Sequence, residues 1–387
     1  MRAVFPMTLL LAWSVPVTAQ VAQHRLSNPD ATYEESLSSI NGVRELPDGR
    51  LMLADGLGQA LIVVDMSTGR ADTIGGVGGG PQEYRTPDAV FALPGDSTLL
   101  VDLGNGRLTV IGPDLRFGET MPLTLGQPGA GPGGLTVLIP RAVDRQGRIY
   151  VQAAGGMSPS GPPDSTYIVR YDRGTQQLDS LVQVKLGERT VSRSGAAGNQ
   201  NVQIRPVPLS PQDGWGVAPD GRIAMVRTDQ YRVEWREPGG RVVSGPAVDY
   251  RPIRIGNDEQ TRWLDNVGRD GLRVSVSVNN GQMQTAFSRG GGSDDRPDPD
   301  QYEWPDVMPA FDANDVAVDP DGDVWVGRYT RAGQPPQFDV FDGRGRLEAQ
   351  VTLPEGRELA GFGNGVVYLT YYDEFDLQYV ERYRVTT

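Results

Sequence analysis

Four oxygen-bearing side chains occupy equivalent places in a phrase that recurs along the chain, and a fifth stands at the next position of one copy. They are Asn41, Asp88, Asp213, Asn314 and Asp315. Hard cations such as calcium prefer carboxylate and amide oxygens, so this pattern predicts a Ca²⁺ site. A structural role is the alternative, because Asn and Asp in front of a strand also satisfy local backbone groups in turns.

Three larger side chains lie close to the same column of the repeat. Arg141, Trp215 and Arg357 stand at or near the starts of their predicted strands. Guanidinium groups bind anions, and an indole ring offers a stacking surface, so we expect these residues to bind a ligand there. Packing in the core is the alternative for Trp215.

Other residue types commonly used in catalysis are scarce. His24 is the only histidine and there is no cysteine, which excludes disulfides, thiolate metal sites and a cysteine nucleophile. Histidine is the usual proton-transfer group near neutral pH, and His24 lies in a segment expected at an outer edge. The sequence therefore predicts no catalytic residue.

The elements that position these side chains come from a sixfold repeat. Each copy has an apolar alternating run, a turn such as Pro47-Asp48-Gly49, and further alternating runs. The copies span 43–53, 90–100, 142–151, 216–226, 316–326 and 359–369. Repeats of this length made of short strands are typical of β-propellers. Because the first strand of each copy runs along the central channel, the candidate residues should converge on its mouth.

The repeat predicts an all-β, six-bladed propeller with four antiparallel strands in each blade. The first blade should use 42–46, 50–54, 60–65 and 71–74 as its strands. The last copy lacks a fourth strand, because the chain ends soon after 377–385. Propellers close their ring by exchanging a terminal strand, so we expect residues 21–37 to pair beside Tyr379–Arg384.

The N-terminus precedes this fold. Arg2, the apolar run 3–13 and Val17-Thr18-Ala19 predict a signal peptide over 1–19, with the propeller over 20–387. No second hydrophobic stretch follows, so we expect no transmembrane segment and a periplasmic or secreted monomer. The net charge of −13 and the pI near 4.7 argue against nucleic acid as a partner.

Residues 250–312 form the longest interruption of the repeat. Asn257 can cap a short helix, two alternating runs flank Asn279-Asn280-Gly281 as a hairpin, and 289–301 is rich in Gly, Asp and Pro. Long insertions on propellers cap the channel or bind partners, and a decoration without a role is the alternative. Both interpretations remain open at this point.

The second repeat resembles the six-bladed propellers of NHL type. Residues 75–87 form a glycine-rich linker with an acidic-aromatic pair and a proline, and 100–110 continue with Val101-Asp102, Asn105 and Arg107. The resemblance covers nearly the whole mature chain and is closest to exported bacterial propellers of unassigned function. The third to sixth repeats depart from the NHL pattern. The resemblance implies the fold and no particular activity.

Two functions follow as hypotheses. The first is an exported, non-catalytic propeller without a cofactor, which binds a protein, peptide or glycan through one face. The second rests on a similarity to gluconolactonase-like propellers, which hold a metal with Asp, Glu and Asn near the channel mouth. That similarity implies a calcium-dependent hydrolase using the Asn/Asp column. We expect the first.

Overall fold

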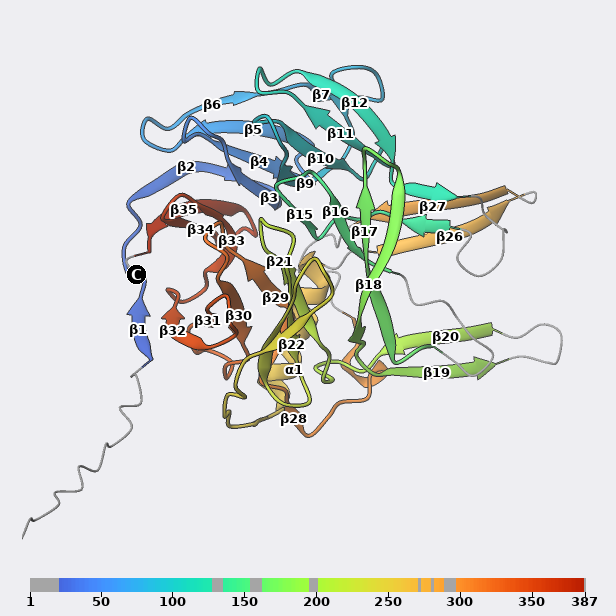
Figure 1. Cartoon of the computed structure of the whole chain (residues 1–387), viewed down its shortest axis with the longest axis vertical. Coiled ribbons are helices and arrows are strands. Elements are labelled where there is room, and N and C mark those ends of the chain that lie inside the picture. Colours follow the sequence, from blue (N-terminus) through green and yellow to red (C-terminus); the bar gives the residue numbers. More distant parts are fainter. Residues whose placement is uncertain are drawn as a thin grey trace, which may run out of the picture.

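The computed structural model describes residues 21–126, 135–153, 162–194, 201–270, 273–279, 282–288 and 297–385. In this part of the chain, six four-stranded antiparallel blades form a ring (Figure 1). The predicted all-β, six-bladed propeller is confirmed. The predicted signal peptide and most of the Gly/Asp/Pro-rich stretch lie outside the described residues.

The first three blades follow one another along the chain. Blade 1 contains β3 (Ile40–Glu45), β4 (Leu51–Asp55), β5 (Ala60–Asp65) and β6 (Arg70–Thr73). Blade 2 contains β9 (Pro87–Ala92), β10 (Thr98–Asp102), β11 (Arg107–Ile111) and β12 (Phe117–Pro122). Blade 3 contains β15 (Ala142–Val143), β16 (Ile149–Gln152), β17 (Ser165–Asp172) and β18 (Gln177–Lys185). The strands predicted for the first copy therefore match blade 1 closely.

The other three blades complete the ring. Blade 4 contains β21 (Gly214–Val217), β22 (Ile223–Arg227), β23 (Arg232–Arg236) and β24 (Val242–Ser244). Blade 5 contains β29 (Phe311–Val318), β30 (Val324–Arg328), β31 (Gln337–Phe341) and β32 (Leu347–Thr352). Blade 6 contains β33 (Glu358–Gly363), β34 (Val366–Tyr372), β35 (Gln378–Arg384) and, from the N-terminal side, β2 (Ala31–Leu37).

Closure of the ring by the N-terminal segment is confirmed. Strand β2 pairs antiparallel with β35, with Tyr33 opposite Val380 (Figure 1). Asp30 forms ion pairs of 2.9 Å with both Arg382 and Arg384. One feature was not predicted: β1 (Ala22–Arg25) adds to the edge of blade 5, parallel to β32.

Short elements decorate the ring. The pairs are β7 (Gly76–Val77) with β8 (Glu83–Tyr84), β13 (Thr124–Gly126) with β14 (Leu135–Val137), and β19 (Arg189–Ser194) with β20 (Asn201–Pro206). Between blades 4 and 5 lie β25 (Ile253–Arg254), α1 (Asn257–Asp270), β26 (Arg273–Asn279), β27 (Gln282–Ser288), the 3₁₀ turn η2 (Pro299–Gln301) and β28 (Val307–Met308). The hairpins β19–β20 and β26–β27 project from one side of the ring (Figure 1).

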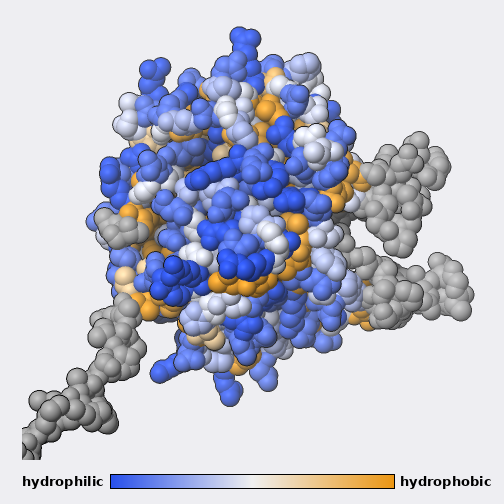
Figure 2. Space-filling model, viewed as in Figure 1, coloured by the Kyte–Doolittle hydropathy of each residue, from blue (hydrophilic) through white to orange (hydrophobic). Residues whose placement is uncertain are grey.

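The buried core lies between neighbouring blades. Six apolar clusters each join strands of two adjacent blades; for example, Tyr231 and Trp235 of blade 4 pack with Phe311 and Phe341 of blade 5. The face in Figure 2 is mostly hydrophilic, with small separate hydrophobic areas. No helix in the described part of the chain is long and apolar enough to cross a membrane.

Candidate functional site

The central channel is the main cavity associated with the predicted residues. It has a volume of about 920 Å³ and is lined by all six inner strands, β3, β9, β15, β21, β29 and β33. Because these strands all run in the same direction, their first residues meet at one end of the channel. We call this end the mouth.

A bulge in β29 shapes the mouth. Phe311 is paired with Arg328 and Val316 with Val326, so four residues, 312–315, lie opposite the single residue Gly327. Gly327 has no side chain to fill this space, and a Cβ atom there would lie 2.5 Å from the Cβ of Asp315. In an uninterrupted strand, successive side chains would alternate between the two faces of the sheet. The bulge instead presents several polar groups at the mouth.

Asp312 is held inside the bulge. Its Oδ1 accepts a 2.9 Å hydrogen bond from the backbone N–H of Asn314, and its carboxyl accepts another from the Tyr329 hydroxyl. Burial outweighs these bonds and raises the pKa of Asp312. The same burial, together with the nearby carboxylates, raises the pKa of Tyr329 well above its ordinary value. Asp312 and Tyr329 therefore support the bulge as a bonded pair.

Asp315 differs because its carboxyl accepts no hydrogen bond from the described residues. Its side chain lines the channel and is open to solvent there. Desolvation by the surrounding protein is the largest cause that raises the pKa of Asp315 to about 8, and repulsion from Asp312 and Glu358 adds to it. Water in the channel weakens this effect without reversing its direction. Near neutral pH, Asp315 can therefore take up or release a proton.

Arg141 directly precedes β15 of blade 3, and its side chain extends across the mouth to blade 5. Its Nη2 donates to the carbonyl oxygens of Ala313 at 2.7 Å and Asn314 at 3.4 Å, and its guanidinium lies 5.2 Å from the ring centre of Trp215. Among the described residues, its Nε and Nη1 have no hydrogen-bond partner. Burial lowers the pKa of Arg141 to about 10, despite the opposing effect of Asp312 and Asp315. Arg141 thus remains a cation at neutral pH, with donors available beside Asp315.

Five of the eight residues singled out in the sequence line the channel: Asn41, Arg141, Trp215, Asn314 and Asp315. Trp215 is fully buried and donates from Nε1 to Gln152 at 2.9 Å, so it packs in the core and also supports Arg141. Asn41 is engaged locally: its Oδ1 accepts from the Gly56 backbone N–H and the Ser39 hydroxyl, each at 3.1 Å.

The other three residues lie off the channel lining. Asp213 accepts hydrogen bonds from Arg227 at 2.8 Å and from the backbone N–H groups of Thr228 and Lys185. Arg357 binds both carboxylate oxygens of buried Glu381 at 3.1 Å. Asp88 is 2% exposed.

The five predicted calcium donors do not fit one ion. Both oxygens of Asp213 and the amide oxygen of Asn41 already accept hydrogen bonds, and the Arg141 cation lies on the bulge that carries Asn314 and Asp315. Within the described ranges, no group of three or more His, Cys, Asp or Glu side chains is placed to hold a metal. We therefore derive no reaction step through calcium.

Helix α1 lies at the same end of the blades as the bulge. Arg262 donates to the carbonyl oxygen of Thr330, and Glu259 accepts a 3.2 Å hydrogen bond from the Ala332 backbone N–H. Residues 330–332 directly follow β30, whose last residue, Arg328, pairs with Phe311 at the start of β29. Helix α1 thus packs beside the mouth.

Asp312 and Tyr329 were missed in the sequence. Both lie outside the column of aligned repeat positions, and the hydrogen bond between them depends on the bulge. The run Asp312-Ala313-Asn314-Asp315 carried a usable signal, because three polar residues within four positions interrupt the apolar alternation of the strand.

Comparisons with known proteins are limited to structures. No family model and no curated protein matches the chain. A calcium-binding protein, regucalcin, from Agrobacterium tumefaciens is 13% identical with a TM-score of 0.36, covering 95% of this chain and 98% of that one. A Xanthomonas campestris gluconolactonase is 12% identical with a TM-score of 0.42, covering 94% and 99%. The PQQ-bound aldose sugar dehydrogenase of Streptomyces coelicolor is 15% identical with a TM-score of 0.42, covering 92% and 97%. Similarity at this level assigns no activity to this chain.

The prediction of a non-catalytic binding propeller is wrong. Structures similar to this one include gluconolactonase- and regucalcin-type proteins. The prediction relied on the lack of histidine and cysteine chemistry. Proton transfer, however, needs only a group with a suitable pKa in the right place, and the raised pKa of Asp315 was not visible in the sequence.

Proposed function

We propose that this chain is a hydrolase of small lactones or related esters, with its reaction centre at the channel mouth. The observation that carries the proposal is the Asp315 carboxyl, which faces the channel, has no hydrogen-bond donor among the described residues and lies near the Arg141 guanidinium. Groups with strongly shifted pKa values gather at reaction centres, and Asp315 combines such a shift with a position in a channel.

In the proposed reaction, Asp315 acts as a general base. Its carboxylate takes a proton from a water molecule as the water oxygen bonds to the substrate carbonyl carbon. The ring C–O bond then breaks, and the proton passes from Asp315 to the leaving alkoxide, which yields a hydroxy acid. A raised pKa makes Asp315 a stronger base than an ordinary carboxylate.

Arg141 stabilises the negative charge that develops on the carbonyl oxygen. Its bonds to the carbonyls of Ala313 and Asn314 and its position over Trp215 fix the guanidinium before substrate arrives. Preorganised donors of this kind lower the barrier of acyl-transfer reactions. Asn314, exposed on the same bulge, can hydrogen-bond a substrate hydroxyl.

Several finer statements belong to the same proposal. Residues 1–19 act as a signal peptide, so the enzyme is exported, and residues 250–312 are an insertion into the repeat. The propeller is of NHL-like type and works as a monomer. Calcium, if bound at all, would use the open oxygens of Asn314 and Asp315, and no step depends on it.

The test is hydrolysis of a panel of five- and six-membered lactones, measured through the protons that the reaction releases. We expect Asp315→Asn to lower kcat/KM by about 10²- to 10⁴-fold, the usual contribution of a general base. Asp114→Asn, on an exposed turn of blade 2, is the matched control and should keep wild-type activity.

Two results would count against the proposal. Absence of hydrolysis across the panel, or an Asp315→Asn variant as active as the control, would overturn the function. Activity that disappears with a chelator and returns with Ca²⁺ would instead contradict the metal-independent mechanism.

A further inference from the structure

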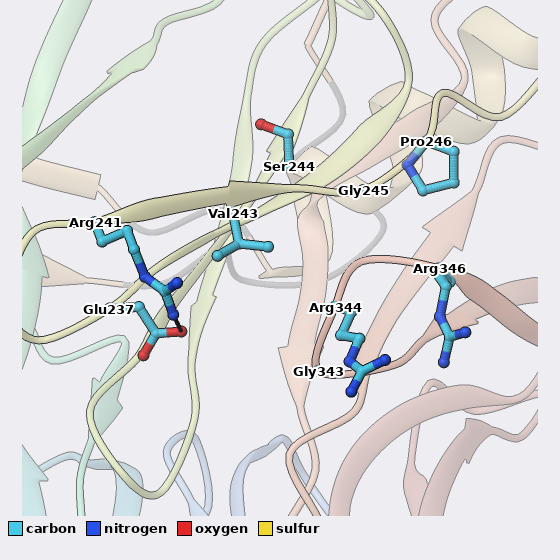
Figure 3. A pocket seen from close by; sticks show the side chains of 9 residues that line it. All are labelled: Glu237, Arg241, Val243, Ser244, Gly245, Pro246, Gly343, Arg344 and Arg346. Atoms are coloured by element: carbon cyan, nitrogen blue, oxygen red, sulfur yellow. Dashed lines mark ion pairs between the residues drawn. The ribbon is translucent and has the colours of Figure 1, made fainter.

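A second hollow lies between the outer parts of blades 4 and 5, away from the channel. It has a volume of about 550 Å³ and is lined from blade 4 by Glu237, Arg241 and residues 243–246, and from blade 5 by Gly343, Arg344 and Arg346 (Figure 3). The turn 342–346 follows β31, and Phe341 pairs with Val324, which pairs with Val318 at the end of β29. This hollow is therefore at the opposite end of blade 5 from Asp315.

Three arginines surround the hollow, although the chain carries a net charge of −13. In Figure 3, Arg344 and Arg346 extend from the blade 5 turn, and Arg241 faces them from blade 4. Arg346 is compensated by Asp342 at 2.6 Å and approaches Glu348 at 3.8 Å. Arg241 reaches Glu237 at only 3.9 Å, an exposed contact of little strength.

Arg344 has no acidic partner among the described residues. Its side chain is exposed and lines the hollow, and no carboxylate in the described part of the chain compensates its charge. A guanidinium group in this state can form two parallel hydrogen bonds with a carboxylate or phosphate. Arg344 is thus the centre of a potential anion site, with Arg241 within the same hollow.

The turn that carries Arg344 is rigidly held. Oδ1 of Asp342 accepts 2.8 Å hydrogen bonds from the backbone N–H groups of Arg344 and Arg346. From blade 4, Trp235 Nε1 donates to the Asp342 carbonyl at 3.1 Å, and Arg222 donates to the Gly343 carbonyl at 3.2 Å. A preorganised turn lowers the entropy cost of binding a ligand.

The blade 4 side of the hollow packs closely against the backbone of the blade 5 turn. A Cβ atom on Gly245 would collide with the backbone of Gly345, and Gly345 has a φ of +75° that favours glycine. Val243 and Pro246 are apolar residues of the lining (Figure 3). The site therefore suits a ligand that combines one anionic group with an apolar body.

We propose that this hollow binds small molecules that carry a carboxylate or phosphate group on an apolar body, with Arg344 as the main contact. This binding is separate from the hydrolase function at the mouth. Arg241 strengthens it once the anion draws that side chain away from Glu237.

The test measures binding of benzoate and phenyl phosphate by ligand-observed NMR, with benzyl alcohol as the neutral probe. Wild-type protein should bind at least one of the two anions saturably and benzyl alcohol not at all. Arg344→Ala should weaken binding about tenfold, the usual loss for a charge-assisted hydrogen bond. Preference between the two anions identifies the group that the site takes.

The Glu237→Gln variant distinguishes anion binding by Arg241 and Arg344 from a purely structural role of these arginines. It removes the carboxylate that competes for Arg241, so we expect about twofold tighter binding of the anion. Arg116→Ala, which removes an exposed arginine of blade 2, should bind as the wild type does. Lack of saturable anion binding, equal binding by Arg344→Ala and wild type, or weaker binding by Glu237→Gln would overturn the proposal.

Discussion

Asp213, directly before β21, and Asp315, in the bulge of β29, belong to neighbouring blades but have opposite surroundings. Asp213 accepts hydrogen bonds from a guanidinium and two backbone N–H groups, which hold its carboxylate in place within the fold. Asp315 receives no such donor from the described residues and instead faces two other carboxyls. One aspartate is therefore held by the fold, and the other keeps an open carboxyl at the channel.

The raised pKa of Asp315 makes the free energy of unfolding depend on pH. The pKa of Asp315 in the folded chain is about 8, above the value of an unfolded aspartate, so folding favours the protonated form. Its contribution to stability is present at low pH and is lost as the pH rises towards 8, because ionisation then costs free energy in the fold. Arg141 offsets part of this cost, whereas Asp312 and Glu358 add to it.

Asp315→Asn should therefore stabilise the protein more at pH 9 than at pH 5. We expect the Tm difference between variant and wild type to be larger by about 2 °C at pH 9, which corresponds to roughly 1 kcal/mol after allowance for solvent screening. Thermal unfolding at both pH values measures it. An equal Tm difference at pH 5 and pH 9 would show that ionisation of Asp315 does not destabilise the fold.

At the scale of elements, the β29 bulge determines where Asp315 lies. The bulge needs the space above Gly327, because an added Cβ would lie 2.5 Å from the Cβ of Asp315. Gly327→Ala should shift Asp315 and lower kcat/KM for lactone hydrolysis by about 10²-fold, as expected for displacement of a reacting group by about 1 Å.

The matched control for this prediction is Gly76→Ala. A Cβ on Gly76 would meet no atom within 4 Å, so its activity should match the wild type. Circular dichroism should show the same strand content for both variants. An active Gly327→Ala enzyme would mean that the position of Asp315 is unimportant for the reaction.

The elements were easier to predict from the sequence than their contacts. Turn phrases such as Pro47-Asp48-Gly49 end one strand and begin the next through local backbone chemistry, so blade 1 matched its prediction closely. The partners of Asp213 and Arg357 lie on other strands, 14 and 24 residues further along the chain. Such pairs depend on strand register, which the repeat alone does not specify.

For the whole molecule, stability comes from six apolar clusters between neighbouring blades. The cluster that joins blades 6 and 1 includes Tyr33 and Leu37 of β2, packed with Leu51 and Val380. Strand β2 therefore supplies both an edge of blade 6 and part of a core. A ring in which each cluster supports the next should unfold in one cooperative transition.

Loss of β2 should weaken the entire ring. Tyr33 is only 6% exposed, so Tyr33→Ala should lower the free energy of unfolding by about 3 kcal/mol, within the range for large-to-small substitutions in cores. Ser36→Ala, on the exposed side of the same strand, should change it by less than about 0.5 kcal/mol. Urea unfolding followed by fluorescence and circular dichroism measures both. Coincident curves at a lower urea midpoint for Tyr33→Ala would support ring closure as a global constraint, whereas two separate transitions would mean that blade 6 unfolds independently of the other five.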